Sequence, residues 1–229
     1  MTELCSERIS IPRAHWALAG EITYDINAAA DRAALLIAPH PFMGGRMDNP
    51  VLLRIAEALA AAGVVVLRFD YRGVGDSGGP PVNIEASMQA FWKTGRAPED
   101  PDLIDDARAA FDWLRTTTGH APVTAVGYSF GAWAATSLPL PSLERLILIA
   151  PTITRHDYPE LAGGTPPTLV VHGEGDFATP CQAMAAWMSR AHSNVRMITF
   201  PRADHFFRAQ EADVANACAS FLHQQEAVA

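Results

Sequence analysis

The sequence predicts an α/β fold with a mostly parallel, doubly wound central sheet flanked by helices. Short apolar runs alternate with longer amphipathic runs, and several short runs are apolar at every position rather than at every second one. Strands buried on both faces have this composition, and they occur in parallel sheets that helices cover. A strand followed by a helix, repeated five times, indicates right-handed crossovers.

The expected strands are short, mostly rich in Val, Ile or Leu, and bounded by Gly or Pro. They cover residues 33–38, 64–69, 123–127, 145–150, 168–173 and 195–200. The weakly alternating region 8–25 predicts an antiparallel hairpin at the sheet edge. Helices are expected over residues 49–63, 100–119, 130–138, 179–191 and 209–225. The first has Pro50 in its first turn and stops at Gly63, an asymmetry typical of helices.

One segment, residues 78–101, does not fit this alternation. It is rich in Pro and Gly but contains the apolar residues Met88, Phe91 and Trp92. Loops of this length inside a compact domain are often lids or binding loops. Two interpretations stay open: a surface loop whose aromatic rings pack on the body, or a flap that faces the substrate. We expect residues 1–229 to form a single domain that carries this segment as a lid or flap.

Composition excludes several classes of partner. The chain has 229 residues, of which 49% are hydrophobic and 18% charged, and its formal net charge is −8. Nucleic acids and anionic membrane surfaces bind basic patches, so neither is expected as the main partner. The cysteines, at positions 5, 181 and 218, are widely spaced and predict neither a disulfide framework nor a zinc cluster. Without a secretory signal or a long apolar run, the chain is expected to be soluble and cytoplasmic.

The segment Gly127-Tyr128-Ser129-Phe130-Gly131 stands where an apolar strand ends and a helix begins. A turn of this kind needs a cramped backbone, and the flanking glycines remove side chains that would collide with it. The serine side chain then lies above the strand ends, close to a helix N-terminus that favours negative charge. The G-x-S-x-G pattern between strand and helix predicts a nucleophile elbow at Ser129.

A reactive serine needs a base, and the base needs an orienting carboxylate. His205 follows the last predicted strand in a loop that can reach back over the sheet edge, and Asp176 follows the strand 168–173. The chain order Ser129, Asp176, His205 is that of the α/β hydrolases. Five other histidines are expected to be solvated and His172 to be structural; the five are His15, His120, His156, His192 and His223.

Backbone N–H groups must bind the negative oxygen of a tetrahedral intermediate. Phe130, directly after the serine, supplies one donor. The second is expected from the loop after the strand 33–38, where Pro41 has no N–H, so Phe42 is the first candidate and Met43 the second. His40 in the same loop is interpreted as an anchor for the loop.

Taken together, these motifs resemble the α/β-hydrolase superfamily over nearly the whole chain. They are "PHPFMGGRMDN", "VVVLRFDYRGVGDSGG", "GYSFGA", "VHGEGDFATP" and "ADHFF". More narrowly, the chain looks like the compact bacterial hydrolases related to dienelactone hydrolases and small carboxylesterases. It departs from dienelactone hydrolases by a serine in place of their cysteine nucleophile. The turn 72–77 resembles a structural turn of the family and receives no catalytic role.

The resemblance implies a hydrolase without metal or cofactor that acts on an ester or thioester. Ser129 would be the nucleophile, with Asp176 and His205 as its base system and the N–H groups of Phe42 and Phe130 as oxyanion hole. Neighbouring apolar residues suggest an apolar acyl or aryl group in the substrate: Phe42, Met43, Met88, Phe91, Trp92, Phe130, Phe206 and Phe207. A peptidase or amidase with the same triad is an alternative, although the sequence offers no acidic subsite. A non-catalytic ligand-binding protein of the same fold is the other.

Overall fold

The computed structural model describes residues 2–161 and 163–223, and eight strands form one sheet in the order β1-β2-β4-β3-β5-β6-β7-β8. The hairpin of β1 and β2 runs antiparallel at one edge, and β2 also pairs antiparallel with β4. The other neighbouring strands are parallel. The predicted mostly parallel sheet with an antiparallel edge hairpin is therefore confirmed.

All six predicted central strands are present, and the sheet has these bounds: β1 Leu4–Pro12, β2 Ala17–Asp25, β3 Ala33–Ile37, β4 Val65–Phe69, β5 Val123–Tyr128, β6 Leu143–Ile149, β7 Thr168–Gly175 and β8 Val195–Asp204. Every residue of β3 and of β5 is buried, which explains why these strands are apolar at consecutive positions.

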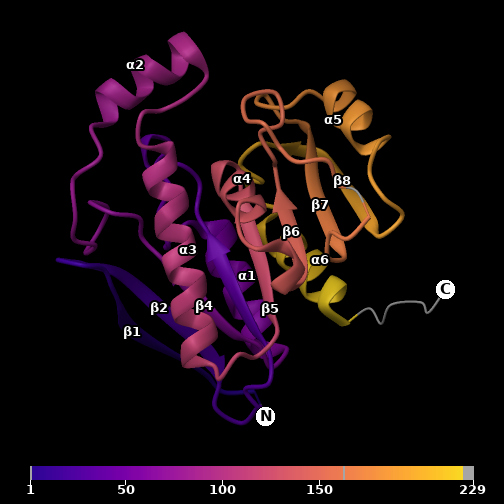
Figure 1. The fold of residues 1–229 in the computed structure, drawn as a ribbon. Coiled ribbons are helices and arrows are strands. Elements are labelled where there is room, and N and C mark those ends of the chain that lie inside the picture. Colours follow the sequence, from indigo (N-terminus) through magenta and orange to yellow (C-terminus); the bar gives the residue numbers. More distant parts are fainter. Residues whose placement is uncertain (1, 162, 224–229) are drawn as a thin grey trace.

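Helices cover both faces of the sheet (Figure 1). Their bounds are α1 Pro50–Ala61, α2 Ile84–Thr94, α3 Asp100–Thr117, α4 Phe130–Thr136, α5 Cys181–Met188 and α6 Glu211–His223, with short 3₁₀ turns η1 at Pro41–Met43 and η2 at Leu140–Ser142. The helices α1 and α6 pack against each other on one face, while α3 and α4 lie together on the other. Residues 224 and 225 of the last predicted helix lie outside the described residues.

The start of α1 follows from its local sequence. The Asn49 side chain accepts hydrogen bonds from the N–H groups of Val51 and Leu52, and Pro50 occupies the first turn. An Asn cap satisfies donors that have no partner inside the helix, and proline there loses no hydrogen bond. The N-terminus predicted from the sequence is therefore capped by Asn49.

The expectation of a loop throughout residues 78–101 is wrong, because the segment contains the helix α2. Asn83 caps this helix by accepting the N–H of Ala86, and Gly95, with a φ of 78°, ends it. The helix stands above the carboxyl ends of the parallel strands, beside the start of α3 (Figure 1). Ser87 is its only buried residue among those described, so α2 packs little of its surface on the body of the protein.

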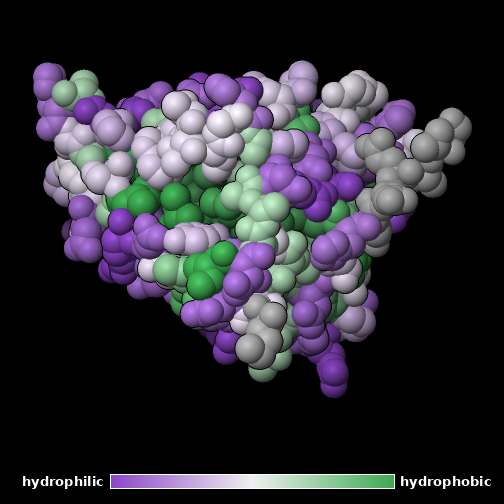
Figure 2. Space-filling view, turned by 90° about the horizontal axis from the view of Figure 1, so that it is seen from below, coloured by the Kyte–Doolittle hydropathy of each residue, from purple (hydrophilic) through white to green (hydrophobic). Residues whose placement is uncertain are grey.

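Figure 2 shows the molecule from below the view of Figure 1, and hydrophobic side chains gather in the middle of this face, between hydrophilic ones. Among the described residues, no helix combines the length and the apolarity that crossing a bilayer requires.

An ion pair fixes the turn after β4 to α3. The Arg72 guanidinium donates to both carboxylate oxygens of Asp106, with distances of 2.8 to 3.1 Å, and the Arg72 backbone N–H donates to Asp106 Oδ2 at 2.9 Å. The Asp106 side chain is fully buried. The turn at residues 72–77 is thus tied to the body by a bidentate contact, which agrees with the structural role expected for it.

Replacing Asp106 by Ala should leave the Arg72 guanidinium without its main partner in a largely buried site. Arg72 keeps an ion pair with Asp102 at 2.8 Å, so its charge is not left uncompensated. The lost hydrogen bonds, including that of the Arg72 backbone N–H, should lower the free energy of unfolding by about 1–3 kcal/mol. Urea unfolding measures it. Asp112→Ala, on an exposed position of the same helix, is the control. Equal small losses in both variants would contradict the assigned role.

Candidate active site

Ser129 occupies a strained turn between β5 and α4. Its φ is 57° and its ψ is −117°, a conformation that non-glycine residues rarely adopt. Side chains at the flanking glycines are impossible. A Cβ at Gly127 would lie 2.1 Å from the Gly131 carbonyl oxygen, and one at Gly131 would lie 2.1 Å from the Ile37 carbonyl oxygen. The two glycines therefore let β3, β5 and α4 approach closely enough to hold the serine in this geometry.

Three side chains from distant parts of the chain meet at this turn. The Nε2 atom of His205 lies 3.0 Å from Ser129 Oγ, and His205 Nδ1 lies 2.9 and 3.0 Å from the two carboxylate oxygens of Asp176. All three residues are buried, with relative exposures of 4 to 7%. The structure thus brings together the serine, histidine and aspartate that the sequence singles out. Glu174, the other carboxylate of this region and a residue of β7, is exposed.

Asp176 is held as an ionised acceptor. Its Oδ1 accepts the backbone N–H groups of Ala178 at 2.7 Å and Thr179 at 3.1 Å. Burial raises the pKa of this carboxyl, but the hydrogen bond and charge of His205, together with the two N–H groups, outweigh burial and lower the pKa overall. A charged Asp176 can therefore orient His205 and stabilise its cation.

The backbone and ring of His205 are fixed from other elements. The Tyr128 hydroxyl donates to the His205 carbonyl oxygen at 2.8 Å. The Phe177 ring lies 5.0 Å from the His205 ring, centroid to centroid. Because Tyr128 precedes Ser129 directly, one segment of β5 positions both the serine and the loop that carries the histidine.

The two expected oxyanion donors, the N–H groups of Phe130 and Phe42, differ in whether they already have a hydrogen-bond acceptor. Phe130 is the first residue of α4, so its N–H has no acceptor inside the helix. The Phe42 N–H donates to His40 Nδ1 at 3.2 Å, and the Met43 N–H donates to the His40 carbonyl oxygen at 2.9 Å. His40 therefore organises the loop after β3, as expected of a loop anchor.

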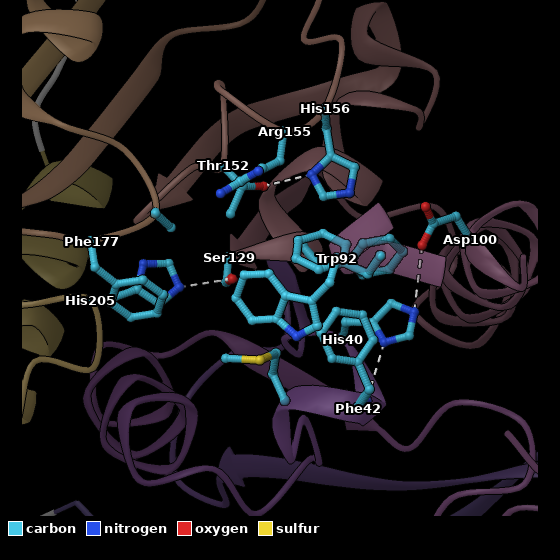
Figure 3. A pocket seen from close by; sticks show the side chains of 14 residues that line it. His40, Phe42, Trp92, Asp100, Ser129, Thr152, Arg155, His156, Phe177 and His205 are labelled. Atoms are coloured by element: carbon cyan, nitrogen blue, oxygen red, sulfur yellow. Dashed lines mark hydrogen bonds and ion pairs between the residues drawn. The ribbon is translucent and has the colours of Figure 1, made fainter. Parts of the chain in front are cut away.

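A mostly apolar pocket of about 160 Å³ adjoins Ser129 and His205 (Figure 3). It is lined by His40, Phe42, Met43, Phe91, Trp92, Asp100, Ser129, Phe130, Thr152, Arg155, His156, Phe177, Ala178 and His205. Phe91 and Trp92 belong to α2, so this helix faces the pocket as a flap would. An apolar cavity of about 150 Å³ holds one benzene molecule, so a group of about that size fits this pocket.

Sequence reasoning places only part of this lining correctly. Met88, Phe206 and Phe207 are not among the lining residues, and Phe207 lies in the core beside Tyr128. The lining residues Asp100, Thr152 and Arg155 were not singled out. The signal for Thr152 and Arg155 was their position just after the apolar strand β6, at the sheet edge where ligands bind in α/β folds.

The expectation that His156 is solvated is wrong. His156 is buried, its Nδ1 lies 2.8 Å from Thr152 Oγ1, and its ring stacks on Trp133 at 4.5 Å between centroids. Burial lowers the pKa of His156 from 6.5 to about 4, against the raising effect of the Asp100 charge. His156 therefore presents a neutral imidazole at neutral pH.

Within residues 2–161 and 163–223, no three His, Cys, Asp or Glu side chains form a group that could hold a metal ion.

With this geometry established, comparison with known proteins decides the family. The family model described as "Serine aminopeptidase, S33" matches residues 49–165, just over half of the chain. The chain belongs to this family. The match includes Ser129 of this hydrolase but ends before Asp176 and His205. The resemblance to the α/β-hydrolase superfamily is thus confirmed, while the narrower dienelactone-hydrolase-like group stays a prediction.

Solved structures of other proteins are similar to this chain over almost its whole length. The hydrolase is 25% identical to an α/β serine hydrolase homologue from Coxiella burnetii, with a TM-score of 0.80 and coverage of 97% of this chain and 98% of that one. It is 26% identical to XC6422 from Xanthomonas campestris, described as an α/β serine hydrolase without lid, with a TM-score of 0.76 and coverage of 95% and 93%.

Among curated proteins, the hydrolase is 28% identical to the uncharacterized protein RP471 of Rickettsia prowazekii, over 82% of this chain and 77% of that protein. It is also 30% identical to the lysophosphatidylserine lipase ABHD12 of Mus musculus, over 49% of this chain. The matched part is only 24% of ABHD12, so this likeness is confined to a segment.

The neutral state of His156 has a consequence for stability. Because its pKa is about 4 in the folded protein and 6.5 in its ordinary state, the unfolded chain binds one more proton between these values. Stability should therefore be unaffected by His156 above pH 6.5 and should fall as the pH drops from 6.5 to 4.

In His156→Gln the loss of stability that His156 causes at low pH should be absent. Urea unfolding at about pH 7 and about pH 5 should show a smaller loss of unfolding free energy in the variant than in the wild type. His15→Gln, at an exposed position, should behave as wild type. Identical pH dependence in wild type and His156→Gln would contradict this account.

Proposed function

We propose that this protein is a serine hydrolase that cleaves a carboxylic ester or a thioester through an acyl-enzyme on Ser129. The observation that carries the proposal is the hydrogen-bonded series from Ser129 Oγ through the His205 imidazole to the Asp176 carboxylate, with heavy-atom distances between 2.9 and 3.0 Å. Nucleophile and base are within the reach that proton transfer requires, and a third group orients the base.

In the proposed reaction, Ser129 Oγ attacks the substrate carbonyl carbon while His205 Nε2 takes the hydroxyl proton. Asp176 keeps the proton on His205 Nδ1 and stabilises the imidazolium that forms. The imidazolium then returns a proton to the departing alcohol or thiol, leaving the acyl group on Ser129. Water, deprotonated by the same histidine, attacks the carbonyl carbon of the acyl-enzyme. The bond from this carbon to Ser129 Oγ breaks, Oγ takes the proton back from His205, and the acid is released.

The oxyanion hole in this proposal consists of the N–H groups of Phe130 and Phe42. The Phe130 donor stands at the start of α4, where the helix dipole also favours negative charge. The Phe42 donor would be shared between the oxyanion and His40 Nδ1, since its present hydrogen bond is 3.2 Å long. A bond of this length is at the weak end of the normal range, so a second acceptor can compete for the proton.

The pocket supports a compact apolar substrate group. Aromatic rings of Phe42, Phe91, Trp92, Phe130 and Phe177 line it, and its volume of about 160 Å³ suits one aromatic ring or a short acyl chain.

A peptide or amide bond is the second candidate, and two observations favour it. The matching family model is described as a serine aminopeptidase, and the pocket contains a carboxylate, Asp100, that a substrate ammonium group could approach. A panel with the same acyl group linked as an ester, a thioester and an anilide separates the candidates by kcat/KM. The proposal requires the ester or the thioester to be cleaved fastest.

A fluorophosphonate probe should label the wild type covalently, because it traps the serine that His205 activates. Labelling should disappear in Ser129→Ala while circular dichroism stays unchanged. Mass spectrometry of the labelled peptide identifies the modified residue. A folded wild type that does not react would favour the non-catalytic ligand-binding alternative.

Replacing Asp176 by Asn should lower kcat by about 10⁴-fold, because the amide cannot hold His205 in the required tautomer. The matched control is Asp204→Asn. This residue precedes His205 but binds the Phe206 N–H at 2.9 Å and Arg208 at 3.0 Å, away from the histidine ring. Stopped-flow and steady-state rates on one ester should show near wild-type turnover for the control. The reverse ranking of the two variants would assign the acid to Asp204.

A further inference from the structure

The end of the pocket away from His205 carries a group of buried polar side chains that the proposed reaction does not use. We call it the distal cluster and define it as His40, Asp100 and His156. Figure 3 shows these three on one side of Ser129 and His205 on the other. Each is buried, with relative exposures of 3, 4 and 6%, and each lines the pocket. Polar groups in an apolar pocket usually serve to orient a ligand.

His40 has a buried donor without an acceptor. Its Nδ1 accepts the Phe42 N–H, so in the neutral ring the proton must be on Nε2. Within the described part of the chain, Nε2 has no hydrogen-bond partner. A buried N–H without an acceptor costs free energy, so this atom favours a ligand that brings an acceptor oxygen.

Asp100 supplies the complementary acceptor. Its Oδ2 accepts the Ala97 N–H at 3.1 Å, which fixes the carboxylate at the start of α3. Its Oδ1 lies 3.5 Å from His40 Nε2, close enough for an ion pair but not aligned as a hydrogen bond. A donor and an acceptor thus lie side by side, 3.5 Å apart, so that a single oxygen atom beside them could bond to both.

His156 completes the cluster as a rigid, neutral ring. It is stacked on Trp133 and bonded to Thr152 Oγ1, and both contacts fix its orientation. Both histidines of the cluster lie against the Phe130 ring, with centroid distances of 4.9 Å for His40 and 5.8 Å for His156. The ring nitrogens add hydrogen-bonding atoms to the cluster, and the ring carries no charge at neutral pH.

The position of the cluster decides which part of the substrate it meets. His205 must protonate the leaving group, so the alcohol or thiol faces His205. The acyl group then extends to the other side of Ser129, where the distal cluster lies (Figure 3). A ring-sized acyl group would fill the apolar pocket between them.

We propose that the distal cluster is a subsite for a hydroxyl group on the acyl part of the substrate, so that the preferred substrates are esters or thioesters of a compact hydroxyaryl or hydroxyalkyl acid. This proposal rests on the proposed hydrolase function and specifies its substrate class. The hydroxyl would donate to Asp100 Oδ1 and accept from His40 Nε2–H.

Other substituents satisfy the cluster less well. A carboxylate would be repelled by Asp100 and by Glu99, whose Oε1 lies 3.6 Å from His40 Nε2. An ammonium group could pair with Asp100 but offers no acceptor to His40. An apolar substituent would leave both polar atoms unpaired. A hydroxyl is both donor and acceptor, and it fits two partners that are 3.5 Å apart.

The first experiment compares methyl esters of phenylacetic acid and of its 3-hydroxy, 4-hydroxy, 4-methyl and 4-aminomethyl derivatives with the wild-type enzyme. We expect one hydroxy ester to exceed the unsubstituted and the methyl ester by about 10- to 100-fold in kcat/KM, as for sites built to bind a substrate hydroxyl. Equal rates for all esters, or a preference for the methyl ester, would overturn the subsite. A preference for the aminomethyl ester would reassign it to an amine.

The second experiment changes the cluster. In Asp100→Asn the side-chain N–H₂ can face the pocket, so the preference for the hydroxy ester should fall to near unity. Asp112→Asn, exposed on the same helix, should keep the wild-type preference. A preference retained in Asp100→Asn would contradict the assignment.

Binding by Ser129→Ala, measured by calorimetry with the same esters, gives a readout without turnover and should show the same ranking. If the wild type cleaves none of these esters and is not labelled by a fluorophosphonate, the proposed function itself fails. If it cleaves them without regard to the hydroxyl, only the subsite proposal fails.

Discussion

The close approach of α4 to strands β3 and β5 determines where every group of the site must lie. It is possible only because Gly127 and Gly131 have no side chains, since a Cβ at either would stand 2.1 Å from a backbone oxygen. The approach forces Ser129 to a φ of 57° and raises its hydroxyl above the strand ends. The N-terminus of α4, the strained Ser129 and the Phe130 N–H, which we propose as an oxyanion donor, thereby lie close together.

The parallel sheet then supplies the partners, because loops after parallel strands meet at one edge. The loop after β7 carries Asp176, the loop after β8 carries His205, and the loop after β3 carries His40 and Phe42. The loop after β6 adds Thr152 and His156. Buried side chains link these loops, as when the Tyr128 hydroxyl of β5 binds the His205 carbonyl oxygen. A rigid sheet with short, cross-bonded loops is a suitable base for a preorganised site.

Much of the fold was predictable because local and global requirements coincide. The consecutive apolar residues of β3 and β5 are what burial on both faces demands, and the caps of α1 match its ends. The helix α2 was missed because it packs on the pocket loops rather than on the core, and Gly78, Gly79, Pro80 and Pro81 before it indicate a loop. His156 was misjudged because a loop histidine carries no local sign that Trp133 will stack on it.

The sequence by itself determined which serine, aspartate and histidine the structure brings together. The serine stands between two glycines after a buried strand, and the aspartate and the histidine follow later strands. Because a parallel sheet brings the loops after its strands to one edge, these three side chains are expected to meet there. Tertiary structure alone decided the shape and polarity of the pocket, because its walls come from seven segments that are separated in the sequence. Asp100, His40 and His156 are unremarkable in the chain, and only folding brings a buried donor and a carboxylate to within 3.5 Å of each other.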